Sequence, residues 1–348
     1  MNVRCFALVL LLASFATGAA QNATPAAAPA AVRRAPTLPI RSAEIAEDRR
    51  VTFRLRAPKA AEVAVTGAFA NGRTAMTKGT NDVWSVTLGP VEPGIWEYSF
   101  NVDGVSMIDP GNPAIKPMRE PRSSILHVTG ATPLVWDFQD VAHGTVHLHT
   151  YRSKALGRVR ELAIYTPPGY DQNAAAKFPT LYLQHGSGDS HATWVTHGKA
   201  HWIFDNLIAQ RRMTPMVVVM MDGHASTGGG NNTELFEQDL LQDVMPFVEA
   251  SYRVKAAAAS RAIVGLSMGG GQSLTIGLNH TEKFAWVGGF SSSVPSKDTV
   301  ASALSDAATT NGGRASYSGD VASKRLIQLR ESYEKPARSL PEEAIPAR

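Results

Sequence analysis

The chain has 348 residues, of which 44% are hydrophobic and 18% are charged, and its formal net charge is +4. A chain of this length can bury one large core or two unequal ones, and we expect two folded domains. The small positive charge forms no basic stripe and the chain holds one cysteine, Cys5, so neither a nucleic-acid partner nor an intrachain disulfide is expected.

The first 39 residues have the composition of a targeting segment and a linker. Residues 1–20 predict a secretory signal peptide, with Arg4 as the positive end, an apolar run at 6–15 and a small-residue cleavage site at 18–20. That run is too short to cross a membrane, so we expect no membrane span. Residues 21–39 are rich in Ala and Pro and cannot form a core. The sequence therefore predicts a secreted or periplasmic protein.

Residues 40–130 predict a small all-β, immunoglobulin-like sandwich. Short segments of alternating hydrophobic residues are separated by turn residues, at 51–56, 62–69, 83–88, 95–102 and 124–128. One face of the fourth segment carries Trp96, Tyr98, Phe100 and Val102. Such a face either fills the core of the sandwich or stacks against sugars, and we favour the core because clustered aromatic residues are usually buried.

Residues 131–295 predict a second domain in which strands and helices alternate. The expected strands are 160–165, 180–185, 215–221, 262–265 and 284–290, and the expected helices between them are 200–210 and 234–252. This alternation is typical of a mainly parallel sheet with helices on both faces. The uninterrupted apolar run at 216–221 is typical of a strand covered on both sides.

The segment Gly265-Leu266-Ser267-Met268-Gly269 has the pattern of a nucleophile elbow. An apolar strand precedes it, and residues 271–278 can form the helix that follows. The flanking glycines lack Cβ and so let the strand and the helix approach closely. We therefore expect Ser267 to be a nucleophile for acyl transfer. The alternative is a glycine-rich turn with an incidental serine.

A second glycine-rich segment, residues 182–188, leaves an expected strand and contains His185-Gly186-Ser187-Gly188. Acyl transfer needs two backbone N–H groups directed at the developing oxyanion. We assign these to Met268 and Ser187, with Gly186 as the alternative to Ser187. A turn with no ligand is the other interpretation of the segment.

Further residues are expected near this site. His185, Gly186 and His224 are candidate pocket residues, and Trp194 either lines the acyl pocket or packs in the core.

The sandwich segment resembles the early-set sandwiches related to carbohydrate-binding module family 48. The resemblance rests on VTFRLRAP at 51–58, VWSVTL at 83–88 and PGIWEYSFNVDG at 93–104. In esterases such a module often precedes the catalytic domain, so we expect it to pack against and position that domain rather than to bind sugar independently.

The second domain resembles carbohydrate esterase family 1, the feruloyl and acetyl-xylan esterases, with enterochelin esterases as more distant relatives. Matching motifs occur in the family's order at 140–146, 165–170, 185–189, 205–209 and 262–273. The resemblance implies an α/β hydrolase that cleaves acyl esters on plant-wall polysaccharide through an acyl-enzyme on Ser267. It implies an acylated carbohydrate or aromatic ester as substrate, and no cofactor or metal. The oligomeric state is left open.

The sequence departs from this family after Ser267. The fold orders its catalytic residues as Ser, Asp and His, yet the only later histidine is His280, thirteen residues on, where we expect it to point away from the serine. Without a histidine to orient, none of the later carboxylates is assigned, among them Asp298, Asp306 and Asp320. Residues 296–348 predict a divergent, poorly ordered tail, so we expect an esterase domain that is incomplete at its C-terminus, through truncation or a shifted reading frame.

Three hypotheses follow from the sequence. The chain is an active secreted esterase, a truncated and catalytically impaired esterase-fold protein, or a carbohydrate-binding or interaction protein that uses its sandwich. A metal site at His191, His197 and His201 is a weaker alternative, because no carboxylate or cysteine pattern accompanies these histidines.

Overall fold

The computed structural model describes residues 40–293, 295–296, 298 and 314–316. The predicted signal peptide at 1–20, the linker at 21–39 and most of the predicted tail at 296–348 lie outside the described residues. In the part of the chain that is described, no helix is long and apolar enough to cross a membrane.

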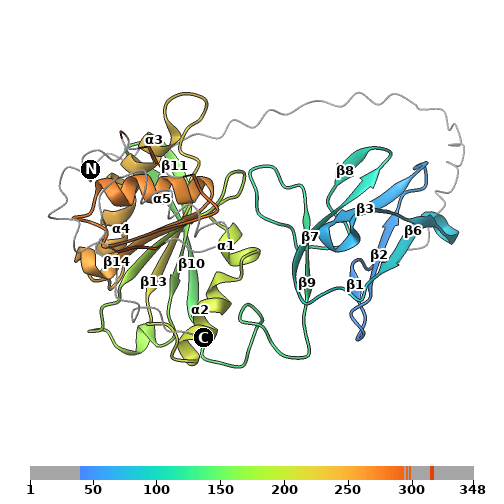
Figure 1. The fold of residues 1–348 in the computed structure, drawn as a ribbon, viewed down its shortest axis with the longest axis horizontal. Helices are drawn as coiled ribbons and strands as arrows, with labels where there is room; N and C mark the ends of the chain where they lie inside the picture. The colour runs from blue at the N-terminus through green and yellow to red at the C-terminus, as the bar shows by residue number, and fades with distance from the viewer. Residues whose placement is uncertain (1–39, 294, 297, 299–313, 317–348) are drawn as a thin grey trace, which may run out of the picture. The chain divides into compact units, whose positions relative to one another are not determined.

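Residues 40–130 form two antiparallel sheets (Figure 1). One sheet has the order β1 (Glu44–Ile45), β2 (Val51–Arg56), β6 (Val83–Leu88) and β5 (Thr77–Lys78). The other has the order β4 (Gly72–Ala75), β3 (Val63–Gly67), β7 (Gly94–Val102) and β8 (Val105–Met107), with β9 (Ser124–Val128) paired to β7. All five strands expected from the sequence are present. The unexpected strands β1, β4, β5 and β8 are short and mostly exposed, so they carry no hydrophobic alternation.

The aromatic face of β7 fills the core of this sandwich. Tyr98 and Phe100 are at most 1% exposed, and the ring of Tyr98 meets that of Phe53 edge-on at 5.0 Å between centroids. Trp96 and Val102 are partly buried against the same cluster. The expectation that these residues form core rather than a sugar platform is confirmed for Tyr98 and Phe100, which have no surface left for a sugar ring.

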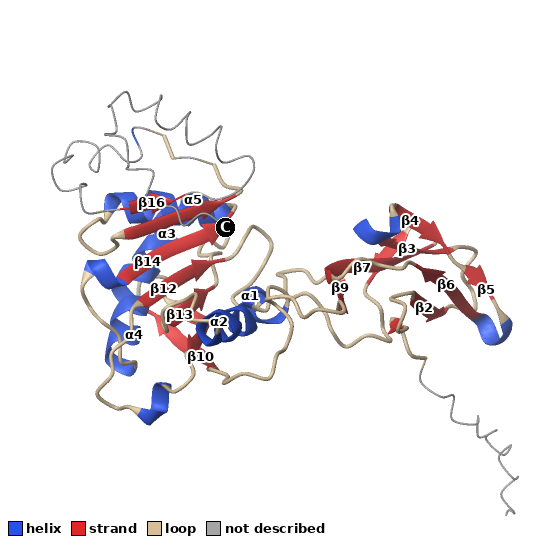
Figure 2. Ribbon diagram, turned by 60° about the horizontal axis from the view of Figure 1, so that its bottom comes forward, coloured by secondary structure: helices blue, strands red, loops and turns tan. Residues whose placement is uncertain are grey.

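A seven-stranded mixed sheet forms the second domain (Figures 1 and 2). Its order is β10 (Thr145–Ser153), β11 (Arg158–Thr166), β13 (Val217–Met221), β12 (Thr180–Gln184), β14 (Arg261–Leu266), β15 (Trp286–Phe290) and β16 (Arg314–Ser316). The strands from β13 to β16 pair in parallel, as expected, whereas β10 and β11 are antiparallel. β10 is an edge strand with many exposed residues, so its polar sequence did not predict it as part of the sheet.

Helices cover both faces of this sheet, as the sequence predicted. Alternate residues of β13 point to opposite sides: Val219 packs with Phe236 and Leu274, while Val218 packs with Phe204. The helices are α1 (Thr193–Thr196) and α2 (Ala200–Ala209) on the Val218 side, and α3 (Asn232–Asp239), α4 (Met245–Ser251) and α5 (Met268–Asn279) on the other. The single helix expected at 234–252 is divided into α3 and α4 by a π-helical turn at Leu240–Val244.

Strand β16 lies in the segment that the sequence predicted as a poorly ordered tail. It pairs in parallel with β15 and extends the sheet by one strand. Three residues, Arg-Ala-Ser, are too few and too polar to show a strand pattern, so no strand was predicted here. The predicted incompleteness of the domain stays a prediction.

We predict that the buried ion pair between β11 and α3 is a major support of this domain. The Arg160 guanidinium lies 3.1 Å from Asp239 Oδ2, with side chains 4% and 0% exposed. Asp239→Asn leaves a buried cation without its counter-charge and should lower the free energy of unfolding by about 3 kcal/mol. Urea denaturation measures this change.

The matched control is Glu62→Gln, which removes an exposed ion pair with Arg73 on the sandwich. It should cost less than about 1 kcal/mol. Equal losses for the two variants would contradict the assigned role of Asp239.

Candidate active site

Ser267 occupies a sharp turn between β14 and α5. Its φ of 80° and ψ of −104° place a non-glycine residue in a backbone region that few side chains adopt. The backbone N–H of Ser267 donates to the carbonyl of Phe290 at 2.9 Å, and the residue is exposed. Such a strained conformation persists only where the surroundings impose it, and it is typical of functional residues.

Glycines impose this turn because neighbouring backbone fills the space of their missing side chains. A Cβ on Gly265 would lie 2.3 Å from the carbonyl carbon of Gly269, so strand and helix contact each other directly. A Cβ on Gly269 would in turn lie 2.5 Å from the carbonyl oxygen of His185. The second contact brings the His185–Gly188 segment against the start of α5. The two motifs found in the sequence therefore lie side by side.

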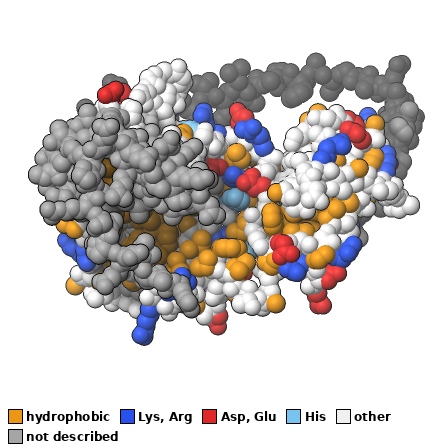
Figure 3. Space-filling view, in the orientation of Figure 1, with side chains coloured by type: hydrophobic (Ala, Val, Ile, Leu, Met, Phe, Trp, Pro, Cys, Tyr) orange, Lys and Arg blue, Asp and Glu red, His pale blue; other side chains and the backbone are white. Residues whose placement is uncertain are grey.

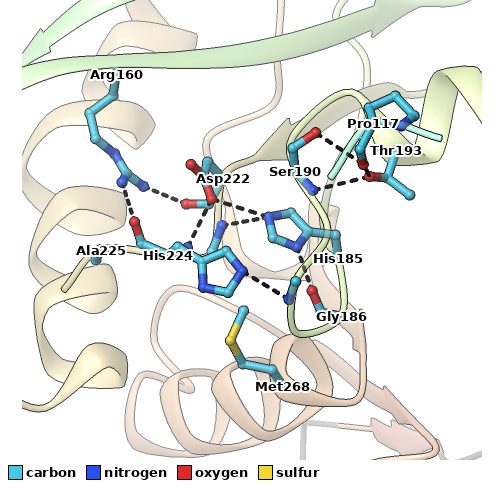
Figure 4. A network of polar contacts seen from close by, with 12 residues as sticks. Pro117, Arg160, His185, Gly186, Ser190, Thr193, Asp222, His224, Ala225 and Met268 are labelled. Carbon is cyan, nitrogen blue, oxygen red and sulfur yellow. Dashed lines mark hydrogen bonds and ion pairs between the residues drawn. The ribbon is translucent and has the colours of Figure 1, made fainter. Parts of the chain in front are cut away.

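His185 braces this arrangement from within. It is 1% exposed, its Nε2 accepts a hydrogen bond from the Gly223 N–H at 2.9 Å, and its Nδ1 lies 2.8 Å from the Gly186 carbonyl (Figure 4). His185 thus links the loop after β12 to the loop after β13.

A cavity of about 1110 Å³ lies beside the elbow. The lining comes from the elbow, from the loops after β12 and β13, from strand β11, from the start of α3 and from Arg119. These residues are Arg119, Arg158, Val159, Arg160, Glu161, Ser187, His191, Asp222, His224, Ser226, Thr227, Gly228, Asn232, Thr233 and Met268. Both expected oxyanion donors, Met268 and Ser187, are among them. As the first residue of α5, Met268 has an N–H with no acceptor inside the helix.

Of the four candidate pocket residues predicted from the sequence, one lines the cavity and three do not. His224 lines the cavity. His185, Gly186 and Trp194 are not among its lining residues, and Trp194 packs against the core cluster of Phe204 on the α2 side of the sheet.

Charged groups of β11 hold the loop after β13 in place. The Arg158 and Arg160 guanidiniums both donate to the carbonyl of His224, and Arg160 also bonds to the carbonyl of Asp222. Burial by itself would raise the pKa of Asp222, but its contact with the His185 ring, the hydrogen bond from the His224 N–H and the charge of Arg160 lower it to about 2. Figure 3 shows histidine, acidic and basic side chains gathered on part of the visible face.

Two histidines of the cavity are kept neutral. Burial lowers the pKa of both His191 and His224; Asp222 partly offsets this effect, and the charge of Arg160 adds to it. The Gly188 N–H donates to His224 Nε2 at 3.2 Å, which requires the neutral ring (Figure 4). The sequence did not single out His191 or the arginines of β11 as pocket residues. The alternation of Arg158 and Arg160 along β11 does not reveal which part of the fold they face, and His191 lies in a loop with no periodic pattern.

The histidines considered as metal ligands contact other groups. His197 Nε2 lies 3.6 Å from a Glu97 carboxylate oxygen, and the His201 ring lies 5.1 Å from that of Trp202. Among the described residues, no group of three or more His, Cys, Asp or Glu side chains is arranged to hold a metal ion.

Comparison with known proteins assigns both domains. Residues 153–325 match the family described as "Putative esterase", and residues 41–117 match carbohydrate-binding module 48, the isoamylase N-terminal domain. The chain carries an esterase-family domain after a carbohydrate-binding module 48 domain. Both resemblances noted in the sequence are thereby confirmed, and the esterase match extends beyond the predicted boundary at residue 295.

Individual relatives agree with this assignment. An endo-1,4-beta-xylanase/feruloyl esterase of Xylanibacter ruminicola is 33% identical over 246 residues, which are 68% of this chain and 34% of that protein. Endo-1,4-beta-xylanase Y of Acetivibrio thermocellus is 32% identical over 139 residues, 36% of this chain and 12% of that protein. This chain thus spans 34% of the first relative and 12% of the second. The enterobactin esterase of Shigella flexneri shares the fold, with a TM-score of 0.57 and 18% identity over 81% of this chain and 86% of that one.

His280 lies at the opposite end of the elbow helix from Ser267. It caps the C-terminus of α5, and its Nε2 lies 2.7 Å from a Glu237 carboxylate oxygen. Twelve helical residues span about 18 Å, so His280 is far from the serine. Within the described part of the chain, no side chain forms a hydrogen bond with Ser267 Oγ. Asp298 is described and exposed, whereas Asp306 and Asp320 lie outside the described residues.

We predict that Gly265→Ala disrupts the elbow of the esterase domain. The new Cβ would overlap the backbone of Gly269, which cannot move without displacing α5, so the free energy of unfolding should fall by about 3 kcal/mol. Gly229→Ala is the control, because nothing lies within 4 Å of its Cβ position, and its effect should stay below about 1 kcal/mol. If thermal denaturation finds Gly265→Ala as stable as the control, the close-approach explanation is wrong.

We also predict that the protein loses stability in two pH windows. The pKa values of His191, His201 and His224 are lowered by burial from 6.5, so below pH 6.5 the unfolded chain binds protons that the folded chain does not. Stability should be constant above pH 6.5 and fall as the pH drops below it. A second loss should follow below pH 3.8 as Asp222 titrates toward its pKa of about 2.

Calorimetric Tm values across this pH range test the prediction. His191→Gln should flatten the upper window, because one differential proton-binding group is removed. A Tm that rises between pH 7 and pH 5 would show that the histidines do not govern this window.

Proposed function

We propose that the chain is a serine carboxylesterase of the feruloyl or acetyl-xylan esterase type, with an α/β-hydrolase fold, acting as a secreted or periplasmic protein. The observation that carries the proposal is the strained, exposed Ser267 at the turn between β14 and α5, packed against the loop that follows β12. Strand, nucleophile turn and helix, with a glycine-rich loop beside them, are the parts that acyl transfer requires in this fold.

The chemistry follows from these parts. Ser267 Oγ attacks the ester carbonyl carbon, and the developing oxyanion is met by the N–H groups of Met268 and Ser187. Collapse of the tetrahedral intermediate releases the alcohol and leaves an acyl-enzyme on Ser267, which water then hydrolyses. Because both N–H donors belong to backbone held by close packing, they need no reorganisation during the reaction.

In this sequence the histidines other than His280 precede Ser267, and His280 lies at the far end of α5. Two of the ten histidines line the cavity with Met268, His191 and His224. The lone pair of His224 Nε2 already accepts the Gly188 N–H. The His191 ring forms no hydrogen bond with any described residue, and its lowered pKa keeps it neutral, so we assign His191 as the histidine to test for this role.

The substrate class follows from the size of the cavity and the relatives. A cavity of about 1110 Å³ is much larger than an acetyl group needs and accommodates an aromatic acyl group with part of a sugar chain. Relatives at 33% and 32% identity are named as a xylanase/feruloyl esterase and a xylanase. Both facts support a plant-wall polysaccharide ester as the substrate.

One observation favours a second candidate function. Because no described side chain bonds to Ser267 Oγ, the site resembles that of an esterase without its base, and a catalytically impaired esterase-fold protein is the alternative. A function confined to sugar binding by the sandwich has less support, since Tyr98 and Phe100 are buried.

We predict that Ser267→Ala lowers kcat/KM for methyl ferulate and p-nitrophenyl acetate at least about 100-fold, because removal of the nucleophile abolishes the acyl-enzyme. His191→Gln should cause a comparable loss and His224→Gln a smaller one. Ser106→Ala, an exposed serine of the sandwich strand β8, is the control and should match the wild type. Wild-type turnover no greater than that of Ser267→Ala would overturn the proposal in favour of the impaired alternative.

A further inference from the structure

Residues 116–119, which we call the anchor strip, join the carbohydrate-binding module to the loop that carries Ser187. Met118 forms an antiparallel bridge with Asp189, and the Arg119 N–H donates to the carbonyl of Gly188 at 2.9 Å. The Pro117 carbonyl accepts the Thr193 hydroxyl at 2.5 Å (Figure 4). The strip is thus attached to the segment after His185 at Gly188, Asp189 and Thr193.

The backbone of Gly188 is held on two sides. Its carbonyl accepts the Arg119 N–H, and its own N–H donates to His224 Nε2. Gly188 has a φ of 82°, so this peptide adopts a conformation that few other residues tolerate. The Gly188 N–H belongs to the Ser187–Gly188 peptide and the Gly188 carbonyl to the next one, so these two bonds orient the two peptides that follow the expected oxyanion donor.

Lys116 connects this loop to the sandwich by charge. Its Nζ lies 2.8 Å from a Glu97 carboxylate oxygen and 3.2 Å from an Asp189 carboxylate oxygen, and the Lys116 and Asp189 side chains are 14% and 10% exposed. Ser123 donates a hydrogen bond to Glu97 at 2.8 Å. Glu97 lies within β7, which pairs with β3 and β9, so the lysine is attached to a rigid sheet.

The partial burial of Lys116 affects both its pKa and the strength of its contacts with Glu97 and Asp189. Burial alone would lower the pKa of Lys116, but the two carboxylates more than offset it and raise the pKa, so the amine stays charged. An enclosed cation between two carboxylates keeps one geometry better than an exposed ion pair does, because solvent screens it less. Asp189 is thereby held on the sandwich side of the loop.

We propose that Lys116 is a positioning residue for ester hydrolysis, which fixes the oxyanion loop through Asp189 and so makes the esterase domain depend on the carbohydrate-binding module. The inference rests on the proposed function. It gives the sandwich a role in catalysis that needs no sugar site on its own surface. A shift of the loop by a fraction of an ångström would misdirect the Ser187 N–H, and misplacement of this size is costly for catalysis.

The test uses the full chain with Lys116→Met, Lys116→Arg and Asp189→Asn, and with the double variant Lys116→Met/Asp189→Asn. Lys78→Met is the matched control, because Lys78 also pairs with a sandwich carboxylate, Asp82, and its other contacts with described residues, Pro58 and Trp84, lie within the sandwich. Two readouts are measured for each variant: hydrogen exchange of residues 186–193, and kcat and KM for p-nitrophenyl acetate.

The proposal predicts several-fold faster exchange at 186–193 and about tenfold lower kcat in Lys116→Met and Asp189→Asn, with KM changed less than about twofold. The double variant should lose no more than the single ones, since both remove the same interaction. Lys116→Arg should recover most of kcat, and Lys78→Met should behave as wild type. Unchanged exchange across the core strands β12–β14 shows that the variants are folded.

Unchanged kcat in Lys116→Met, with or without faster exchange, would overturn the proposal, as would equal effects of Lys116→Met and Lys78→Met. Failure of the proposed function is seen separately, as wild-type turnover equal to that of Ser267→Ala. In that case exchange at 186–193 still decides whether Lys116 holds the loop, and exchange equal to wild type in Lys116→Met contradicts it.

Discussion

The approach of the Gly269 backbone to the carbonyl of His185 determines the rest of the candidate site. With 2.5 Å between that oxygen and the position of a Cβ, only glycine allows α5 to start where it does. The same packing holds Ser267 in its strained conformation and sets Met268, the first residue of α5, beside the loop of Ser187. The proposed nucleophile and oxyanion donors are therefore placed by backbone contacts, which are stiffer than side-chain contacts.

Polar interactions extend this framework outward. Arg160 is held by the buried Asp239 and in turn fixes the loop of Asp222 and His224. His185 and His224 connect that loop to the turn after β12, through the Gly223 and Gly188 N–H groups. Burial favours the neutral ring of His224, and the charge of Arg160 favours an ionised Asp222.

Much of the fold could be predicted from the sequence because periodic burial leaves a pattern. Strand β2 buries alternate residues, helix α2 buries one face, and β13 is buried along its whole length. Each of these burial patterns appears in the sequence as a matching spacing of apolar residues. The edge strand β10 and the short β16 are polar or brief, so local pattern carried no signal. The elbow was identifiable because the glycines that its close packing requires, Gly265 and Gly269, flank Ser267 in the sequence.

The residues of the candidate site that sequence reasoning missed are brought together only by the fold. Lys116 and Arg119 come from the sandwich segment, in the loop before β9, and Arg160 comes from β11. Their partners in the esterase domain lie more than 60 positions away, as with Lys116 and Asp189, so spacing could not connect them. The same holds for His191, whose neutral ring was assigned only once the cavity was known.

The central claim is that Ser267 forms a covalent acyl-enzyme. Rapid-quench mass spectrometry after mixing with p-nitrophenyl acetate tests it most directly, by locating the acetyl group in a proteolytic digest. Our account predicts one acetyl group per chain on the peptide that contains Ser267, present at early times and lost by hydrolysis. An unmodified Ser267 peptide while p-nitrophenol is being released would contradict it.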